Sequence, residues 1–423
     1  MLKNKKILAV LLAFCMLVLS LSVAVSAEEA TEPEGSNYPY IFVHGMMGWG
    51  SYDGAEKLSP YWGGRNGDML QSLREQGYEC YSASVGKISS YWDRACELYA
   101  QLTGTVVDYG EAHSAAHNHA RYGRSYEGNA LMDTFGKTDE NGDIIKVNLF
   151  GHSMGGPTVR LLAWLLENGS EAEREASGEE VSSLFVGGKG HYVHSVTTWS
   201  APHNGSPVAN VLYDNTKATV VILGLLANIL GSSSRPDLWD YQLEQYGLTS
   251  VKSQGIKARF SLTNIKKFIS EDDNCGYDLT LRGSKALNDM IDTVDGIYYF
   301  SVTGQRVHEL SDGTYAPNKG MFIMFPLSAR LMGKYDGSKT YDGIVMDKSW
   351  ALNDGVVPVI SGRAPFDEEA VEYEEVKDSP LETGIWHVMP IIENFSHVGY
   401  MGMDTSEFQY LYERQMQIIN SLE

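Results

Sequence analysis

The spacing of apolar and polar residues along the chain predicts short strands that alternate with helices. Apolar runs rich in β-branched and aromatic residues predict strands at residues 41–43, 78–85, 146–150, 192–199 and 297–302. Apolar residues at helical spacing predict helices at 93–102 and 158–169. Strands and helices in alternation favour an α/β fold with a mostly parallel central sheet flanked by helices. The acidic stretch FDEEAVEYEEVKDS (366–379) lacks either pattern and is expected to form a solvated loop.

The first 27 residues have the pattern of a secretory signal peptide. Lysines precede an apolar run over residues 7–25, and small residues up to Ala27 offer a cleavage site. If it stayed uncleaved, this run would be long enough to anchor the chain in a bilayer. Residues 28–37 form an acidic, polar tether, so we expect cleavage after Ala27, secretion to the extracellular space without a stable membrane anchor, and one domain over residues 38–423.

Composition narrows the classes of partner. The net charge is −21, and removal of the signal peptide with its three lysines makes it −24. A chain this acidic repels nucleic acid, so no nucleic-acid partner is expected. Cys80, Cys96 and Cys275 would remain after cleavage, and an odd count of three allows at most one disulfide.

The stretch KVNLFGHSMGGPTVRLLAWLL contains a candidate nucleophile. GHSMG (151–155) fits the pattern G-x-S-x-G, which is weak by itself in a chain with 43 glycines. Here a predicted strand ends just before it and a predicted helix follows, with Pro157 in the first turn. This context predicts a sharp strand-to-helix turn that exposes the Ser153 hydroxyl.

A serine nucleophile needs a base that takes its proton and hydrogen-bond donors that stabilise the oxyanion of the tetrahedral intermediate. The stretch IFVHGMMGWG (41–50) predicts a strand followed by a tight turn, and the backbone N–H groups of Met46 and Met154 are candidate oxyanion donors. His44 is expected to be a structural histidine of this turn, because the usual chain order in this arrangement is Ser, then Asp or Glu, then His.

Downstream residues offer more than one acid and base. Asp354 in LNDGVVP is a candidate acid, with Asp347 and Asp367 as rivals. The late histidines His387 and His397 are both candidate bases, and the pattern alone does not choose between them.

Three histidines lie within the stretch HSAAHNH (113–119). His113 and His117 would share one face of a helix, whereas His117 and His119 would share one face of a strand. Imidazole is a good zinc ligand, but a tetrahedral site needs further Cys, His, Asp or Glu ligands from elsewhere in the chain. Solvated or hydrogen-bonded histidines are the alternative.

The chain resembles the large, zinc-containing secreted lipases of thermophilic bacilli and staphylococci, from about Tyr38 to the C-terminus. The matching stretches are VHGMMGWG, YWGGRNGD, YWDRACELYAQLTGTVVDYGEAHSAAHNHARYGR, LLENGS, SVTTWSAPHNGS, YDLTLRGSKALN and LNDGVVP. The resemblance implies an α/β-hydrolase fold with a zinc-binding insertion at about 60–125 and a lid at about 206–235. It also implies a triacylglycerol lipase that acts on ester substrates at a lipid–water interface.

The resemblance also implies roles for individual residues. Ser153 would be the nucleophile, Asp354 the acid and His397 the base, with the oxyanion bound by the amides of Met46 and Met154. A structural zinc ion would be held by Asp93, His113, His119 and Asp273. Asp68, Asp272 and Cys275 are the nearest rivals among the zinc ligands, and His117 would be a bystander.

The family that this chain resembles also binds calcium, at a site beside the catalytic histidine. Its carboxylate ligands would fall on positions 399 and 404, but here the first is Gly399 and only Asp404 is acidic. Because one carboxylate ligand is missing, calcium is not among the expected cofactors.

Two other functions remain open at this point. A carboxylesterase for short, soluble esters would use the same three residues, and a secreted binding protein on the same fold would have lost the activity. The apolar run ATVVILGLLANIL (218–230) bears on the first alternative, because as a lid it would favour lipid interfaces. It would otherwise be a buried core helix.

Overall fold

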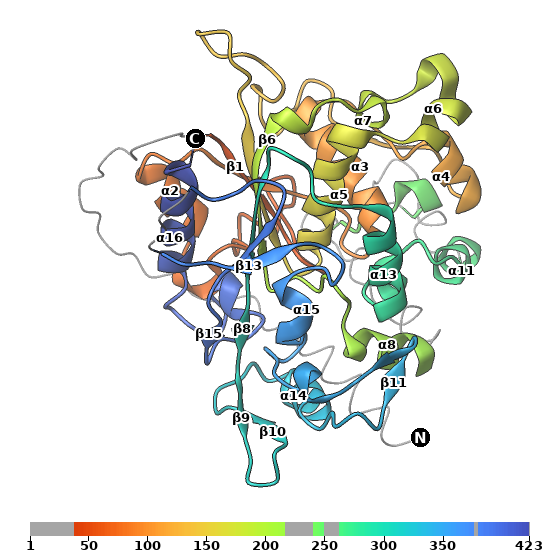
Figure 1. Ribbon diagram of the computed structural model, residues 1–423. Coiled ribbons are helices and arrows are strands. Elements are labelled where there is room, and N and C mark those ends of the chain that lie inside the picture. Colours follow the sequence, from red (N-terminus) through yellow and green to blue (C-terminus); the bar gives the residue numbers. More distant parts are fainter. Residues whose placement is uncertain (1–37, 216–239, 249–261, 376–379, 423) are drawn as a thin grey trace.

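A seven-stranded parallel sheet forms the centre of the protein (Figure 1). The computed structural model describes residues 38–215, 240–248, 262–375 and 380–422. The strand order is β13-β14-β7-β6-β5-β1-β2, and each neighbouring pair is parallel. The strands are β1 (Tyr40–Val43), β2 (Cys80–Ala83), β5 (Val147–His152), β6 (Val193–Trp199), β7 (Tyr298–Val302), β13 (Ala370–Glu372) and β14 (Trp386–Val388).

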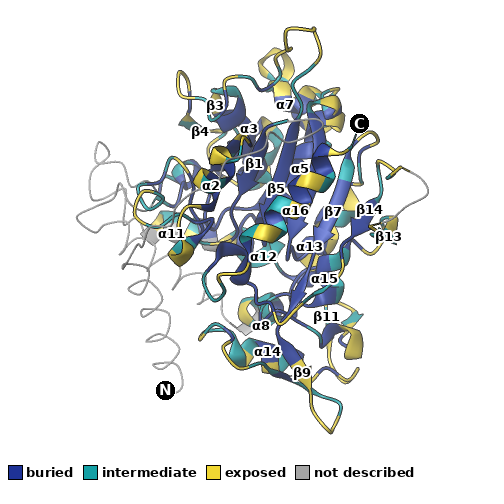
Figure 2. Cartoon of the chain, turned by 90° about the vertical axis from the view of Figure 1, so that its left-hand side faces the viewer, coloured by how far each residue is buried: buried dark blue, intermediate teal, exposed yellow. Residues whose placement is uncertain are grey.

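Helices cover both faces of this sheet (Figure 1). On one face lie α3 (Tyr91–Thr103) and α5 (Gly155–Asn168), and on the other lie α2 (Met69–Glu75) and α16 (Gln409–Asn420). Alternate residues of a strand point to opposite faces, so Ile41 and Val43 pack in the core beneath α3 and α5. Tyr40 and Phe42 pack in the core beneath α2 and α16. Figure 2 shows the resulting buried sheet between helices with exposed outer faces.

Shorter elements surround this centre. Further helices are α4 (Glu111–Ala116), α6 (Glu171–Ser177), α7 (Ser183–Val186), α8 (Pro207–Asn215), α11 (Leu262–Ser270), α12 (Cys275–Asp278), α13 (Leu281–Met290), α14 (Pro326–Met332) and α15 (Val359–Arg363). Two-stranded sheets pair β3 (Val106–Asp108) with β4 (Tyr122–Ser125), β8 (Gly304–Gln305) with β15 (Ile392–Glu393), β9 (Val307–Glu309) with β10 (Tyr315–Pro317), and β11 (Thr340–Tyr341) with β12 (Ile344–Val345).

The expected α/β architecture with a mostly parallel sheet is confirmed, and all five predicted strands and both predicted helices are present. The expectation of a purely looped acidic stretch at 366–379 is wrong, because β13 lies inside it. This edge strand pairs with β14 through its backbone while Ala370 and Glu372 stay exposed, so it needs no apolar pattern.

Some expectations fall on parts of the chain outside the described residues. These are the signal peptide, the tether to position 37, and the lid beyond α8, including the run at 218–230. Within the described ranges, no helix is long and apolar enough to cross a membrane. The three cysteines in those ranges are buried and form no disulfide with one another.

Candidate active site and metal centre

Ser153 occupies a strained turn between β5 and α5. Its φ is +54°, a left-handed conformation that is uncommon for a residue with a side chain. Its backbone N–H donates to Trp199 O at 2.9 Å, and Gly156 N donates back to Ser153 O at 2.9 Å. The turn therefore holds the serine at the carboxyl edge of the sheet, where ligands bind in parallel α/β folds.

The glycines around Ser153 allow the turn to form. A Cβ atom on Gly151 would lie 2.4 Å from Gly155 O, and one on Gly155 would lie 2.2 Å from Val43 O. Both contacts are with backbone atoms, which cannot rotate away as a flexible side chain can. The close approach of α5 to β1 therefore requires glycine here.

We expect Gly155→Ala to lower the free energy of unfolding by at least about 2 kcal/mol, because the new methyl group forces α5 away from β1. Gly188→Ala is the matched control, since its Cβ meets no atom within 4 Å and only its φ of +73° is unfavourable. Urea titration of both variants checks this. Equal losses would show that the contact with Val43 O is not limiting.

Three residues distant in sequence form one hydrogen-bonded chain at this edge. His397 Nε2 lies 2.8 Å from Ser153 Oγ, and His397 Nδ1 lies 2.8 Å from Asp354 Oδ2. The Asp354 side chain is fully buried, and its Oδ1 accepts from the backbone N–H groups of Val356 at 2.8 Å and Val357 at 2.7 Å. These bonds hold the carboxylate in the orientation that reaches the imidazole.

The rival acids and base lie elsewhere. Asp347 caps a short helical turn by accepting from Ser349 N, and Asp367 is exposed. His387 is buried in β14, with Nε2 donating to Glu382 O at 2.8 Å. The structure thus brings Asp354 and His397, rather than these alternatives, to Ser153.

The turn after β1 packs against Ser153. A Cβ on Gly45 would lie 2.8 Å from Ser153 Cβ, so the backbone that leads to Met46 passes directly beside the serine. His44 is fully buried, and its Nε2 accepts from Val85 N at 3.3 Å. Burial, together with the charges of Arg94 and Lys87, lowers the pKa of His44 well below its usual value, so the ring is neutral.

A hydrogen-bonded chain that the sequence did not suggest joins this turn to His397. Gly45 N donates to Tyr61 Oη at 2.9 Å, and Tyr61 Oη lies 2.7 Å from His152 Nδ1. His152 Nε2 in turn donates to His397 O at 2.9 Å. Burial, with the nearby His397 ring, lowers the pKa of His152 well below its usual value, which keeps the ring neutral and able to both donate and accept.

Ser200 is another contact that sequence reasoning missed. It directly follows β6 with a φ of +48°, and its hydroxyl donates to Asp354 Oδ2. Ser200 directly follows a predicted strand, at the same sheet edge as Ser153. This position is the sequence feature that could have identified the contact.

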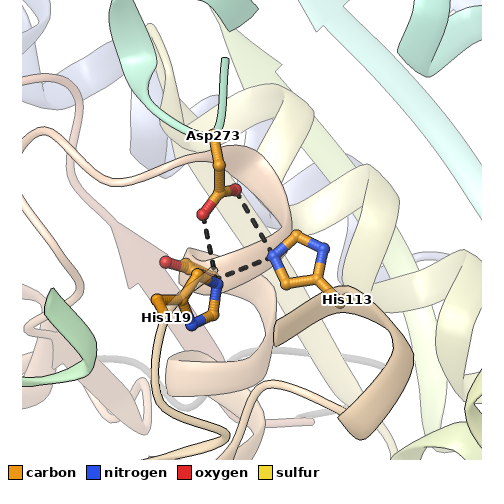
Figure 3. A group of neighbouring side chains, drawn as sticks. His113, His119 and Asp273 are labelled. Atoms are coloured by element: carbon orange, nitrogen blue, oxygen red, sulfur yellow. Dashed lines mark ion pairs between the residues drawn. The ribbon is translucent and has the colours of Figure 1, made fainter. Parts of the chain in front are cut away.

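A second cluster lies away from Ser153 and gathers two carboxylates and two imidazoles. Asp93 in the first turn of α3, His113 in α4, His119 just beyond α4, and Asp273 before α12 have potential ligand atoms within 4.8 Å of one another. Figure 3 shows His113, His119 and Asp273 facing one point. His113 Nε2 lies 3.4 Å from both Asp93 Oδ1 and Asp273 Oδ1, and His119 Nε2 lies 3.3 Å from Asp273 Oδ2.

The donor atoms of this cluster fit a metal ion. Asp93 Oδ1, His113 Nε2 and His119 Nε2 are buried and make no hydrogen bond to a described group. The other atoms have partners that orient the ligands, since His119 Nδ1 donates to Ala120 O at 2.9 Å and Gln245 Nε2 donates to Asp93 Oδ2 at 2.6 Å. The unsatisfied atoms therefore all face the shared centre, as ligand atoms would.

Electrostatics favour a cation at the same point. Burial raises the pKa of Asp93, and the facing charge of Asp273 raises it further. Burial lowers the pKa of His113, but the two carboxylates outweigh it and raise that pKa to about 10. The two facing carboxylates therefore favour a positive charge between them, which a metal ion would supply.

The i,i+4 spacing along the sequence pairs His113 with His117, but in the fold His113 pairs with His119. Helix α4 ends at Ala116, and Asn118 adopts a left-handed φ of +55°, which turns the chain so that His119 faces His113 across the centre. His117 is half-buried beside the His113 ring and lies outside the cluster.

The three rival ligands are also engaged elsewhere. Asp68 caps α2 by accepting from Gln71 N at 3.0 Å, and Asp272 accepts from Tyr213 Oη. Cys275 is buried, and burial raises the pKa of its thiol to about 12, which disfavours the thiolate that binds metals.

A serine on a strained strand-to-helix turn, hydrogen-bonded through histidine to a buried aspartate, is the arrangement found in serine hydrolases. The chain belongs to the family described as "Lipase-like, C-terminal domain", which it matches over residues 36–422.

Known relatives carry the name lipase. The chain is 38% identical over 380 residues to Lipase 2 of Staphylococcus aureus, covering 88% of this chain and 51% of that protein. It thus spans about half the length of the curated relatives it matches. Staphylococcus hyicus lipase has a similar structure, with 32% identity, a TM-score of 0.78, and coverage of 93% of this chain and 98% of that one. Lipase 1 from Pelosinus fermentans is similar at 34% identity and a TM-score of 0.74, with coverage of 92% and 99%.

Proposed function

We propose that this chain is a secreted triacylglycerol lipase that hydrolyses carboxylic esters of glycerol through Ser153, His397 and Asp354. The observation that carries the proposal is the 2.8 Å contact between Ser153 Oγ and His397 Nε2, on a turn that holds the serine at the carboxyl edge of the sheet. The names of the relatives and the signal-peptide pattern support the substrate class and the secretion.

The geometry supports an acyl-enzyme mechanism. His397 Nε2 takes the proton of Ser153 as Oγ attacks the ester carbonyl, and the imidazolium then protonates the leaving alcohol. Asp354 holds Nδ1 protonated so that Nε2 is the basic atom. The N–H groups of Met46 and Met154 bind the oxyanion, and water then releases the fatty acid by the reverse sequence of proton transfers.

The strand order is consistent with an α/β-hydrolase fold. β1 and β2 are followed by a crossover to β5, after which β6, β7 and β14 are added outward in chain order. Ser153 follows the central β5, and the acid and base lie on loops nearer the C-terminus, in the order Ser, Asp, His.

Exposed apolar side chains near the triad support contact with a lipid–water interface. The Phe325 ring centre lies 6.3 Å from that of His397, and in the same segment Ile323 and Leu327 are 79% and 76% exposed. Met46 beside the serine is also exposed. Such side chains bury their surface when the enzyme adsorbs to lipid.

The Asp93, His113, His119 and Asp273 cluster is proposed to hold a structural zinc ion. Two carboxylates and two neutral imidazoles balance the charge of a divalent ion and fill a tetrahedral site, leaving no position for a substrate. When bound, the ion ties the segments of α3 and α4 to the residues before α12, far along the chain.

A hydrolysis profile across acyl chain lengths, run below and above the solubility limit, separates a lipase from a carboxylesterase for short esters. We expect the hydrolysis rate on long-chain glycerides to rise once an emulsion forms, because the exposed side chains of Met46, Ile323 and Leu327 can then contact lipid. Activity confined to short, dissolved esters would support the carboxylesterase. No labelling by a serine-reactive fluorophosphonate would support a binding protein.

A further inference from the structure

Arg306 lies between the loop that contains Asp354 and the loop that contains His397. Its backbone N–H donates to Asn353 O at 3.0 Å, one residue before Asp354. On the other side, the carbonyl of the preceding residue accepts from Phe395 N at 2.8 Å, two residues before His397. The main chain at this point therefore contacts both loops that supply the partners of Ser153.

The side chain of Arg306 reinforces the same connection. Arg306 Nη1 lies 3.1 Å from Asp404 Oδ2, and the same oxygen accepts from the hydroxyl of Ser396. Ser396 is fully buried and directly precedes His397. A guanidinium–carboxylate–hydroxyl bridge thus ends one residue from the proposed base.

The bridge is shielded from water. The side chains of Arg306 and Asp404 are only 11% and 8% exposed, so solvent and salt screen their attraction weakly. Arg306 Nε and Asp404 Oδ1 are also buried and make no hydrogen bond to a described group. The planar guanidinium thus reaches Asp404 through Nη1, and lysine would replace it with a single point charge on a flexible stem.

The residues present do not fit the calcium site that the family resemblance implies. Gly399 supplies no carboxylate, and a Cβ at that position would lie 2.7 Å from a carbon of the Phe395 ring. Asp404 already faces the positive charge of Arg306, which would repel a divalent cation. In the described part of the chain, the only cluster of three or more His, Cys, Asp or Glu residues that could hold a metal is the one containing Asp93.

We propose that Arg306 is a positioning residue for the triad and takes the structural role that a bound calcium ion would have. Through its backbone it anchors the Asp354 loop, and through Asp404 and Ser396 it anchors His397. The inference rests on the proposed function, because it concerns the orientation of His397 toward Ser153. It implies that neither the activity nor the stability of the enzyme depends on calcium.

The test compares variants of the full, zinc-loaded protein on a soluble ester, in buffer freed of calcium and with calcium added. For Arg306→Gln we expect kcat to fall about tenfold or more with KM within about twofold of wild type, because a misplaced base slows chemistry more than binding. Arg306→Lys should recover part of kcat. Arg363→Gln, which removes an exposed pair with Glu372, is the matched control and should keep wild-type kcat.

Calcium should change neither kcat nor the melting temperature of the wild type. If Arg306→Gln does not fold, the double variant Arg306→Met with Asp404→Leu replaces both charges by apolar groups and should still lose kcat. A wild-type kcat in a folded Arg306 variant, an equal loss in Arg363→Gln, or activation of the wild type by calcium would overturn the inference. Ester hydrolysis that survives the loss of Ser153 would instead overturn the proposed function, so the two failures are distinguishable.

Discussion

Ser153→Ala is expected to reduce ester hydrolysis to below about one hundredth of the wild-type rate while leaving the protein folded. The reason is that Ser153 Oγ is the atom facing His397 Nε2, and alanine leaves no nucleophile. Initial rates on a soluble ester and on an emulsion, with a melting curve for each protein, check the prediction. A larger residual rate, after contaminating esterase has been excluded, would contradict the assignment.

The two late histidines give an internal control. His397→Ala should be comparably damaging, because it removes the base and its contact with Asp354. His387→Ala should be mild in rate, because His387 lies inside β14 and donates to Glu382 O rather than contacting Ser153. The reverse order would mean that the wrong histidine has been assigned as the base.

Removal of the proposed zinc ion should lower the melting temperature by at least about 5 °C, because an ion that binds only the folded form adds its binding free energy to folding. Purified protein should contain about one zinc per chain, the stoichiometry of a closed four-ligand site. Metal analysis and melting curves with and without chelator measure both quantities. As a chelator removes the ion, the melting temperature should fall first. The hydrolysis rate at low temperature should fall only later, since the cluster lies apart from Ser153.

His119 and His117 are a matched pair for this site. His119→Ala should lose the metal, because its Nε2 faces Asp273, whereas His117→Ala should keep it. Metal-free protein of unchanged stability, or loss of metal only in His117→Ala, would rule out the proposed ligand set.

The sequence pattern was sufficient to predict those elements whose determining contacts lie between residues close together in the chain. The strand ending before GHSMG and the helix after it were predicted because strand and helix periods are visible within ten residues. The turn at Ser153 was predicted because glycines bracket it. The edge strand β13 was missed because it forms through backbone pairing with β14, which leaves no apolar pattern in an acidic segment.

The candidate zinc ligands show how far resemblance adds to pattern. Helical spacing alone pairs His113 with His117, and only the resemblance favoured His119. The left-handed Asn118 after the end of α4 is the physical reason that His119 faces the cluster. Asp273 could not be reached by spacing at all, since it arrives from far along the chain.

By itself, the sequence determined the alternation of strands and helices, the turn at Ser153, and the absence of a carboxylate at position 399. Each of these depends on residue type and near neighbours. The pattern left the late histidine and aspartate open, the resemblance favoured His397 and Asp354, and only the tertiary structure shows that their side chains reach Ser153 and that Arg306 faces Asp404. The reason is that loops following different parallel strands meet at one edge of the sheet, so their contacts depend on strand order and register rather than on distance along the chain.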